Sequence, residues 1–327
     1  MKRSTAFLAS LTVALSASLS AAGQQHLSIA TGGTGGVYYP LGSGLAQLIS
    51  NHLTGYRAIA EVTGASVENV GLVSREQSDV AFALSDTVSH AYHGQGRFEN
   101  RQLTNLRALA SLYVNALHLV TLAGSDIESL EDLRGKRVSI GAPGSGTEVS
   151  VRTLLAANGL ALDEMTTQRL NFNETANALR DGLIDAGFWS VGPPTSSIVD
   201  LATTRDIRII SLDDETIERT REAEPVFVRY EMEEGVYPGQ DAPVATIGTA
   251  NVLVVNQAMD NELAFRLTAL VYAGKDYLAG IHPAANAIDP ELTLETAPIP
   301  LHPGARHYFR QMGHGTPEEL HTPASEP

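Results

Sequence analysis

Two glycine-rich segments contain the residues that are best suited to hold a ligand. The first, Thr31-Gly32-Gly33-Thr34-Gly35-Gly36-Val37-Tyr38-Tyr39-Pro40, lies between a predicted strand and a predicted helix. Its four glycines let the backbone approach a ligand closely and point several N–H groups at it. The helix that follows adds the positive end of its dipole, which suits a carboxylate or a phosphate. We therefore predict a small-anion site, with a tight turn as the alternative. Its residues in this segment are Thr34, Gly35, Gly36, Val37 and Tyr38.

Neither of the common nucleotide-binding patterns fits this first segment. The dinucleotide fingerprint needs Gly-x-Gly-x-x-Gly, but counting from Gly33 the sixth position is Tyr38. The Walker pattern needs a lysine followed by serine or threonine, and no such pair follows these glycines. The segment therefore favours a ligand smaller than a nucleotide.

The second segment, Gly141-Ala142-Pro143-Gly144-Ser145-Gly146-Thr147, nearly reproduces a phosphate-binding loop. Thr147 stands where that loop has its lysine, so the side chain that holds the outer phosphates is missing. What remains is a set of backbone amides with two hydroxyls, which suits a carboxylate. We predict that Ser145, Gly146 and Thr147 face the first segment across the binding site.

Polar residues after two other predicted strands are candidates for the same site. Ser66 and Asn69 begin one helix, and Ser85 and Asp86 begin another. Helix capping explains each of them equally well when it is taken alone. All four belong to the sheet edge of the first glycine segment, so some can also serve a ligand. The last candidates are two aromatic residues at the end of a later strand, Phe188 and Trp189. Their rings could line the cleft, or they could pack in the core.

Motifs for catalysis and for metal binding are missing from the sequence. Cysteine is absent, which excludes disulfides, thiolate zinc sites and cysteine nucleophiles. Neither a Gly-x-Ser-x-Gly elbow nor a His-Glu-x-x-His motif occurs, and the ten histidines are scattered. We therefore predict a protein that is not an enzyme, with no catalytic residue, cofactor or metal. The alternative is an exported α/β enzyme that acts on a small carboxylic acid in the same cleft.

The elements that must position these residues alternate between short β-branched runs and helical stretches, which indicates an α/β protein. A strand at 26–30 and a helix at about 40–53 flank the first glycine segment, and a strand at 137–140 and a helix at 147–157 flank the second. Two such units place two helix N-termini at the carboxyl ends of their sheets, where open α/β sheets bind ligands. Further predicted elements are strands at 106–112 and 117–122 and a long helix at about 260–279.

The first residues of the chain have the pattern of a signal peptide. Lys2 and Arg3 form a positive start, residues 6–19 are apolar, and Ser20-Ala21-Ala22 supplies small residues for cleavage. We predict that residues 1–22 are removed and that the mature protein is periplasmic, with a buried N-terminal helix as the alternative. The chain has 37 Asp and Glu against 22 Lys and Arg, which argues against a nucleic-acid partner.

Five stretches spread along the mature chain match the sequence pattern of a known family. They are residues 29–42, Ser78-Asp79-Val80-Ala81-Phe82 with Asp86, residues 130–136, residues 141–147 and residues 299–306. In these stretches the sequence resembles the TAXI family, the solute-binding proteins of tripartite ATP-independent periplasmic (TRAP) transporters. The resemblance implies capture of a small organic acid, such as glutamate, glutamine or 2-oxoglutarate. It also implies delivery of that acid to a TRAP permease that is driven by an ion gradient, usually of sodium.

The resemblance also implies a two-lobed periplasmic-binding-protein fold, type II-like. Each lobe would be a mostly parallel sheet flanked by helices, and crossing hinge strands would join the two. We expect residues 23–116 and 246–327 to form lobe 1 and residues 117–245 to form lobe 2, in a monomer that docks transiently on its permease. In the sister family of TRAP binding proteins an arginine clamps the carboxylate. Neither glycine segment here contains an arginine, so the ligand's identity stays open.

Overall fold

A mixed sheet of ten strands runs through residues 24–315, which are the residues that the computed structural model describes. The predicted signal peptide at 1–22 lies outside them. The strands are β1 (Gln25–Ala30), β2 (Tyr56–Glu61), β3 (Val80–Leu84), β4 (Leu106–Leu122), β5 (Arg137–Ser139), β6 (Thr166–Gln168), β7 (Ala186–Val191), β8 (Ile207–Ile209), β9 (Phe227–Met232) and β10 (Val244–Asn256).

The strand order is β2-β1-β3-β10-β4-β7-β5-β6, with β8 paired to β4 and β9 paired to β10. The outer strands pair in parallel, β1 with β2 and β3, and β5 with β6 and β7. Strands β4 and β10 run antiparallel to each other and to their neighbours. The predicted α/β class is therefore confirmed, as a curled sheet whose parallel ends are joined by antiparallel central strands.

Eleven α-helices and four short 3-10 helices accompany the sheet in the described residues. The α-helices are α1 (Tyr38–His52), α2 (Ser66–Ser74), α3 (Ser85–His93), α4 (Gly146–Ala157), α5 (Phe172–Arg180), α6 (Ser196–Ala202), α7 (Asp214–Ala223), α8 (Asn261–Ala273), α9 (Lys275–Ile281), α10 (Pro290–Thr296) and α11 (Pro303–Gln311). The 3-10 helices are η1 (Gly96–Phe98), η2 (Glu131–Leu133), η3 (Leu162–Glu164) and η4 (Pro283–Ala287). None of the helices in this part of the chain is long and apolar enough to cross a membrane.

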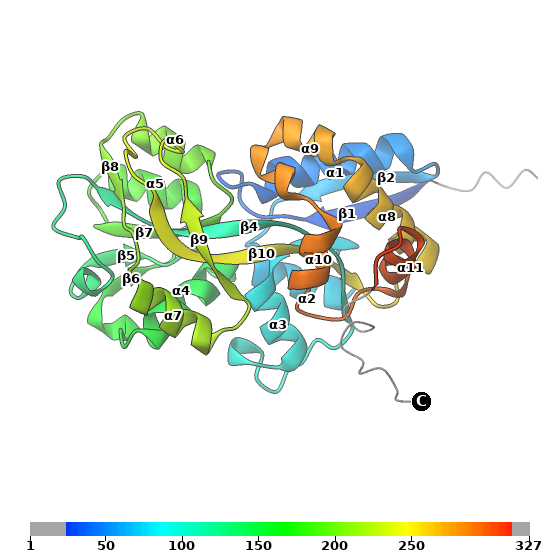
Figure 1. The fold of residues 1–327 in the computed structure, drawn as a ribbon, viewed down its shortest axis with the longest axis horizontal. Helices are drawn as coiled ribbons and strands as arrows, with labels where there is room; N and C mark the ends of the chain where they lie inside the picture. The colour runs from blue at the N-terminus through cyan, green and yellow to red at the C-terminus, as the bar shows by residue number, and fades with distance from the viewer. Residues whose placement is uncertain (1–23, 316–327) are drawn as a thin grey trace, which may run out of the picture.

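Two groups of elements lie at opposite ends of the long strands β4 and β10 (Figure 1). The terminal half contains β1–β3, α1–α3 and α8–α11, and the central half contains β5–β9 and α4–α7. Strand β10 pairs with β9 over residues 244–249 and with β3 over residues 251–255, so it passes from one half into the other. Strand β4 makes the same passage, because its last residues pair with β7 and β8.

The two predicted strands at 106–112 and 117–122 form one continuous strand, β4. The polar residues Asn115 and His118 interrupt the apolar pattern of the sequence, but both are buried within the strand. Asn115 donates to Ser190 O and accepts from Asn251 Nδ2, which satisfies its amide inside the sheet. The pairing of β4 with β10 shifts register near Ala250 and again near Leu253, and such bulges bend paired strands.

The long helix predicted at about 260–279 is divided into α8 and α9 at Gly274. A Cβ atom on Gly274 would lie 2.4 Å from Leu48 Cδ1 of α1, so a larger residue there would require the Leu48 side chain to move. This break lets α9 turn along α1, as Figure 1 shows.

The hydrophobic residues gather in two cores. The larger core fills the terminal half, with Phe82 and Leu253, and continues beneath α5 and α6 to Trp189 and Leu201. The smaller core lies in the central half, beneath α4 and α7. Helices therefore cover both faces of the sheet in the central half, and one of those faces continues the core of the terminal half.

Candidate functional site

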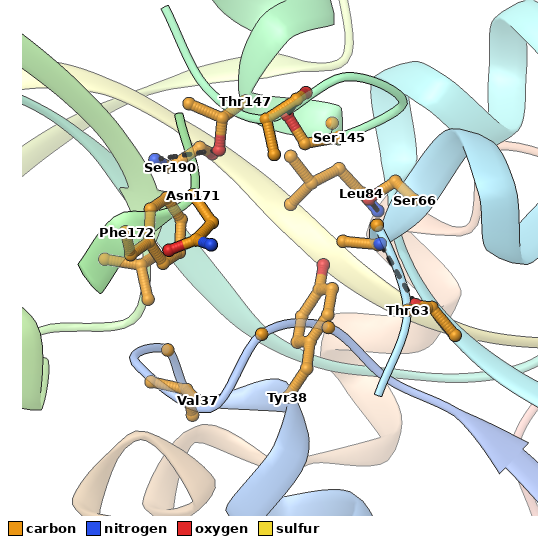
Figure 2. A pocket seen from close by; sticks show the side chains of 18 of the residues that line it. Val37, Tyr38, Thr63, Ser66, Leu84, Ser145, Thr147, Asn171, Phe172 and Ser190 are labelled. Atoms are coloured by element: carbon orange, nitrogen blue, oxygen red, sulfur yellow. Dashed lines mark hydrogen bonds between the residues drawn. The ribbon is translucent and has the colours of Figure 1, made fainter. Parts of the chain in front are cut away.

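A cavity of about 240 Å³ lies where the terminal and central halves face each other (Figure 2). The terminal half lines it with Gly32, Gly33, Gly36, Val37, Tyr38, Val62, Thr63, Gly64, Ala65, Ser66 and Leu84. The central half and β4 line it with Ala142, Ser145, Gly146, Thr147, Asn171, Phe172, Ser190, Val191 and Asn115. A cavity between two halves is a common position for a small-molecule site.

Four helices begin at this cavity, because the first residues of α1, α2, α4 and α5 all line it. These residues are Tyr38, Ser66, Gly146 and Phe172. The first N–H groups of a helix have no acceptor within the helix and carry the positive end of its dipole. In α2 two of these groups are already bonded, since the N–H groups of Val67 and Glu68 donate to Gly144 O at 3.1 and 3.3 Å. In α4 and α5 the third N–H group is bonded to the N-cap side chain, Glu148 N to Ser145 Oγ and Glu174 N to Asn171 Oδ1, whereas the first N–H group of each has no bonded partner in the described structure.

Every side chain that lines the cavity is uncharged, so no Asp, Glu, Lys, Arg or His from the described residues belongs to its wall. The electrostatic field inside it therefore comes from helix N-termini, backbone amides and hydroxyl groups. Such an arrangement attracts a negative group without an ion pair.

Two hydroxyls on the cavity wall are buried without a hydrogen-bond partner in the described structure, Tyr38 Oη and Ser190 Oγ. Tyr38 is only 9% exposed and Ser190 5%, so bulk water reaches neither side chain freely. Figure 2 shows the Tyr38 hydroxyl pointing to the middle of the cavity. Burial raises the pKa of Tyr38 well above its ordinary value, and the nearby Ser66 side chain lowers the pKa only in part, so the phenol stays neutral. An unpaired buried polar group costs about 1–3 kcal/mol, which a ligand acceptor would recover.

Half of the predicted site residues line the cavity: Gly36, Val37, Tyr38, Ser66, Ser145, Gly146 and Thr147. The two glycine segments thus face each other. The second segment is shaped by Ser145, whose hydroxyl donates to Ala142 O and accepts the Glu148 N–H as the N-cap of α4. Gly141 has a φ of +99°, and a Cβ there would lie 2.8 Å from Thr147 Cβ, so the turn requires glycine.

Thr34 and Gly35 lie outside the cavity and contact the central half instead. Thr195 Oγ1 donates to Gly35 O at 3.0 Å, and Asn173 Nδ2 donates to Thr34 Oγ1 at 3.5 Å. These two residues of the first glycine segment therefore hold the halves together beside the cavity.

Asn69, Ser85 and Asp86 also lie outside the cavity, in buried hydrogen bonds that join elements. Asn69 Nδ2 donates to Thr31 O at 2.6 Å and to Phe82 O at 2.8 Å, which ties β1 to β3. The Ser85 and Thr249 hydroxyls are bonded at 2.9 Å across to β10. Asp86 accepts from Ser150 Oγ of α4 at 2.6 Å, and this bond crosses between the halves.

Phe188 and Trp189 do not reach the cavity, because β7 is covered on both faces. Adjacent strand residues point to opposite faces, so Phe188 enters the smaller core and Trp189 the larger one. The Trp189 ring stacks on Phe172 with 6.3 Å between ring centroids. Trp189 therefore supports Phe172, which is itself on the cavity wall.

Four further lining residues were not predicted from the sequence: Asn171, Phe172, Ser190 and Asn115. A signal for the first two was present, because Asn171 followed by Glu174 is a capping box. Asn171 Oδ1 accepts the Glu174 N–H at 3.0 Å, and Glu174 Oε2 accepts the Asn171 N–H at 2.9 Å. The helix therefore begins at Phe172, directly after its N-cap Asn171.

Helix α3 makes polar contacts with the opposite half. His90 Nε2 and Glu224 Oε2 lie 2.5 Å apart, next to the buried pair of Asp86 and Ser150. The hydrogen bond that His90 donates to Glu224 raises the pKa of His90, and burial raises the pKa of Asp86. These contacts show the two halves closed on each other around the cavity.

A curled mixed α/β sheet in two halves, with a cavity between them, is the fold of periplasmic solute-binding proteins. The chain belongs to the NMT1-like family, whose model matches residues 29–313.

The chain is similar to several solved structures, and the first two below, with TM-scores above 0.5, agree with this fold. A protein from Bordetella bronchiseptica RB50 has a TM-score of 0.56 and 20% identity, covering 88% of this chain and 98% of its own. A candidate L-cystine ABC transporter from Listeria monocytogenes has a TM-score of 0.51 and 14% identity, with 81% and 98% covered. The alkanesulfonate-binding protein SsuA from Xanthomonas axonopodis pv. citri, bound to MOPS, has a TM-score of 0.49 and 14% identity, with 84% of each chain covered.

Proposed function

We propose that this protein is an extracytoplasmic solute-binding protein that captures a small organic acid between its two halves and leaves it chemically unchanged. The observation that carries this proposal is the convergence of four helix N-termini and two unpartnered hydroxyls on a cavity with an uncharged wall in the described structure. A carboxylate would accept hydrogen bonds from such groups and would be stabilised by the helix dipoles.

The hydrogen-bond donors lie on both halves, and this arrangement explains how the protein would capture an anion by closing around it. The Gly146 and Thr147 amides and the Ser190 hydroxyl belong to the central half, and the Tyr38 hydroxyl to the terminal half. An anion that accepts from both halves would stabilise the closed state over the open one, since only closure brings the donors together. The proposed contact residues are the seven predicted ones on the wall, together with Asn171, Phe172 and Ser190.

We further propose that the halves move as two lobes, residues 23–116 with 246–327 and residues 117–245, about a hinge in β4 and β10. The bulges in the pairing of these strands support a bend there. Small-angle scattering would show a smaller radius of gyration on ligand addition. The same data would report the oligomeric state, which we propose to be a monomer.

Delivery to a TRAP permease in the periplasm is the transport role that we propose. The sequence resemblance to the TAXI family and the signal-peptide pattern support it. An ABC permease is the second candidate, because the solved neighbour from Listeria monocytogenes is described as an ABC transporter. Uptake of labelled acid by cells that depend on this protein separates the two. Collapse of the sodium gradient should stop uptake in the first case, and depletion of ATP alone should stop it in the second.

A thermal-shift screen of small acids tests the binding role itself. A ligand at 100 times its dissociation constant should stabilise the protein by about 2.7 kcal/mol. The ligand recovered afterwards should be unchanged, and conversion to a product would favour the enzyme alternative.

A charge placed in the second glycine segment tests the position of the site. Aspartate caps helices as well as serine does, so Ser145→Asp should fold. Its carboxylate would stand in a poorly hydrated cavity beside a bound acid, and affinity should fall by about 100-fold or more. Ser196→Asp adds the same charge at an exposed position in α6 and should bind normally. Equal affinity in both variants would place the ligand elsewhere.

A further inference from the structure

Apart from the Tyr38 and Ser190 hydroxyls, which can either donate or accept, most hydrogen-bond acceptors on the cavity side chains already accept a bond. Asn171 Oδ1 accepts the Glu174 N–H at 3.0 Å, and Asn115 Oδ1 accepts from Asn251 Nδ2 at 2.8 Å. Other hydroxyl oxygens accept backbone N–H groups. These bonds are Leu84 N to Ser66 Oγ at 3.1 Å, Glu148 N to Ser145 Oγ at 3.2 Å and Ser190 N to Thr147 Oγ1 at 3.4 Å.

Hydrogen-bond donors, in contrast, remain available to a ligand. Tyr38 Oη and Ser190 Oγ have no partner in the described structure. The side-chain amide of Asn171 is turned toward the middle of the cavity, opposite Tyr38 (Figure 2). The first N–H groups of α4, at Gly146 and Thr147, add backbone donors. The cavity therefore offers more donors than acceptors.

The nearest carboxylates are all engaged in hydrogen bonds or ion pairs with other groups of the protein. Glu148 accepts from Arg152 at 2.8 Å and from Arg169 at 2.9 Å, and these arginines hold the pKa of Glu148 below its usual value despite burial. Glu68 accepts the Gly64 N–H at 2.6 Å, and Asp86 accepts the Ser150 hydroxyl. No carboxylate of the described chain is left on the cavity wall to pair with a cation.

We propose that the ligand is a 2-oxo acid and that the corresponding α-amino acids are excluded. This inference rests on the proposed function and narrows it. A 2-oxo acid presents acceptor oxygens on its carboxylate and on its carbonyl, which match the donors in number and kind. An α-ammonium brings three donors and no acceptor. It would also lie unpaired beside helix N-termini, whose positive ends repel a cation.

Matched pairs of acids test this inference on the unmodified protein. Bound ligand is first removed by unfolding and refolding, and binding is then measured by titration calorimetry. The pairs are 2-oxoglutarate with L-glutamate and 4-methyl-2-oxopentanoate with L-leucine, which differ only at the second carbon. We expect the oxo acid of a binding pair to bind at least about 100-fold more tightly, a difference of about 2.7 kcal/mol. An amino acid that binds as tightly as its oxo acid would overturn the inference and leave the binding role intact. If no organic acid bound at all, the proposed function would fail with it.

A variant that supplies the missing counter-charge gives an independent test. Asn171→Asp keeps an N-cap residue at the start of α5 and places a carboxylate beside the cavity. We expect it to bind the oxo acid at least tenfold more weakly and to gain measurable affinity for the amino acid. Asn177→Asp makes the same change at an exposed site of α5 and should keep the original preference. A folded Asn171→Asp protein that retains the original preference would contradict the inference.

Discussion

Tyr38 and Tyr113 show how differently two buried hydroxyls can be used. Both hydroxyl oxygens are buried without a hydrogen-bond partner in the described structure, and burial raises the pKa of both phenols. Only Tyr38 lines the cavity, whereas the Tyr113 ring packs against Gly192 within the fold. A ligand in the cavity could therefore form a hydrogen bond with the Tyr38 hydroxyl but not with the Tyr113 hydroxyl.

Removing the Tyr38 or the Tyr113 hydroxyl should show which of them contributes to ligand affinity and which does not. Tyr38→Phe should lower affinity for the acid by about 10- to 100-fold, since a hydrogen bond to a charged group is worth about 1.5–3 kcal/mol. Tyr113→Phe should bind the acid normally. Neither variant should be less stable without ligand, because each loses an unpaired polar group. Calorimetry and thermal melting measure the two effects, and equal affinities in the two variants would remove Tyr38 from the site.

Gly146 is placed where the halves touch, which gives a second residue-level prediction. A Cβ atom there would lie 2.6 Å from Ser66 Oγ and 2.7 Å from Leu84 Cδ1, both in the terminal half. Gly146→Ala should therefore hinder closure and weaken binding at least about tenfold, while the added helix propensity leaves the open protein stable. Gly280→Ala in α9, where a Cβ would meet no atom within 4 Å, is the matched control. A Gly146→Ala protein with normal affinity would mean that this contact does not limit closure.

At the scale of elements, the sequence predicted the glycine segments and their helices well because local chemistry determines them. A strand, several glycines and a capping residue recur at both places, and no distant contact is needed to recognise them. The roles of Asn69 and Asp86 could not be predicted in this way. Their partners, such as Phe82 O and Ser150 Oγ, come from other elements, and only the tertiary fold distinguishes a structural bond from a free one.

Two other elements were missed for a related reason. Helix α7 and strand β9 lie on the outer side of the central half, and most of their residues are exposed. In β9 only Phe227 and Met232 are buried, so the alternation that marks a half-buried strand is weak. The pairing of β9 with β10 stabilises it, and that pairing is not visible in the local sequence.

We predict that ionisable groups of helix α3 make binding dependent on pH. Its His90 faces Glu224 and lies near Asp86, and its pKa is raised in the closed protein. A raised pKa means that closure favours protonated His90. The stabilisation of the closed state by His90 is therefore complete below about pH 6.5, and it is lost as the pH rises through the raised pKa. Asp86, whose pKa is also raised, acts in the same direction, since its buried carboxyl ionises as the pH rises. Affinity for the acid should therefore be higher at pH 5.5 than at pH 8.5.

Calorimetry across this range, with two histidine variants, measures the effect. His90→Gln should flatten the dependence of affinity on pH. His93→Gln changes an exposed histidine of the same helix and should leave the dependence unchanged. A wild-type affinity that does not vary with pH would show that α3 contributes nothing to closure.

At the scale of the whole molecule, the cavity and the surface have opposite electrostatic character. The chain has a formal net charge of −15, whereas the described wall of the cavity is uncharged and faces helix N-termini. A strongly negative protein can therefore bind an anion, because short-range donors act inside a closed space while the surface charges are screened by salt over about 10 Å at 0.1 M.

This contrast predicts different responses of stability and binding to sodium chloride. Screening relieves the repulsion among the acidic surface groups, and it weakens exposed ion pairs such as Arg229–Asp214, each worth about 1 kcal/mol or less. With 37 acidic against 22 basic residues the repulsion should dominate, so the melting temperature should rise between 0.1 and 1 M salt. Affinity for the acid should change by less than about threefold over the same range, because the contacts are desolvated and short. Thermal melting and calorimetry measure the two responses, with sucrose as an uncharged control for general solvent effects. A melting temperature that falls with salt would show that the surface ion pairs outweigh the repulsion. A large loss of affinity would show that long-range attraction, and not the donors of the cavity, holds the ligand.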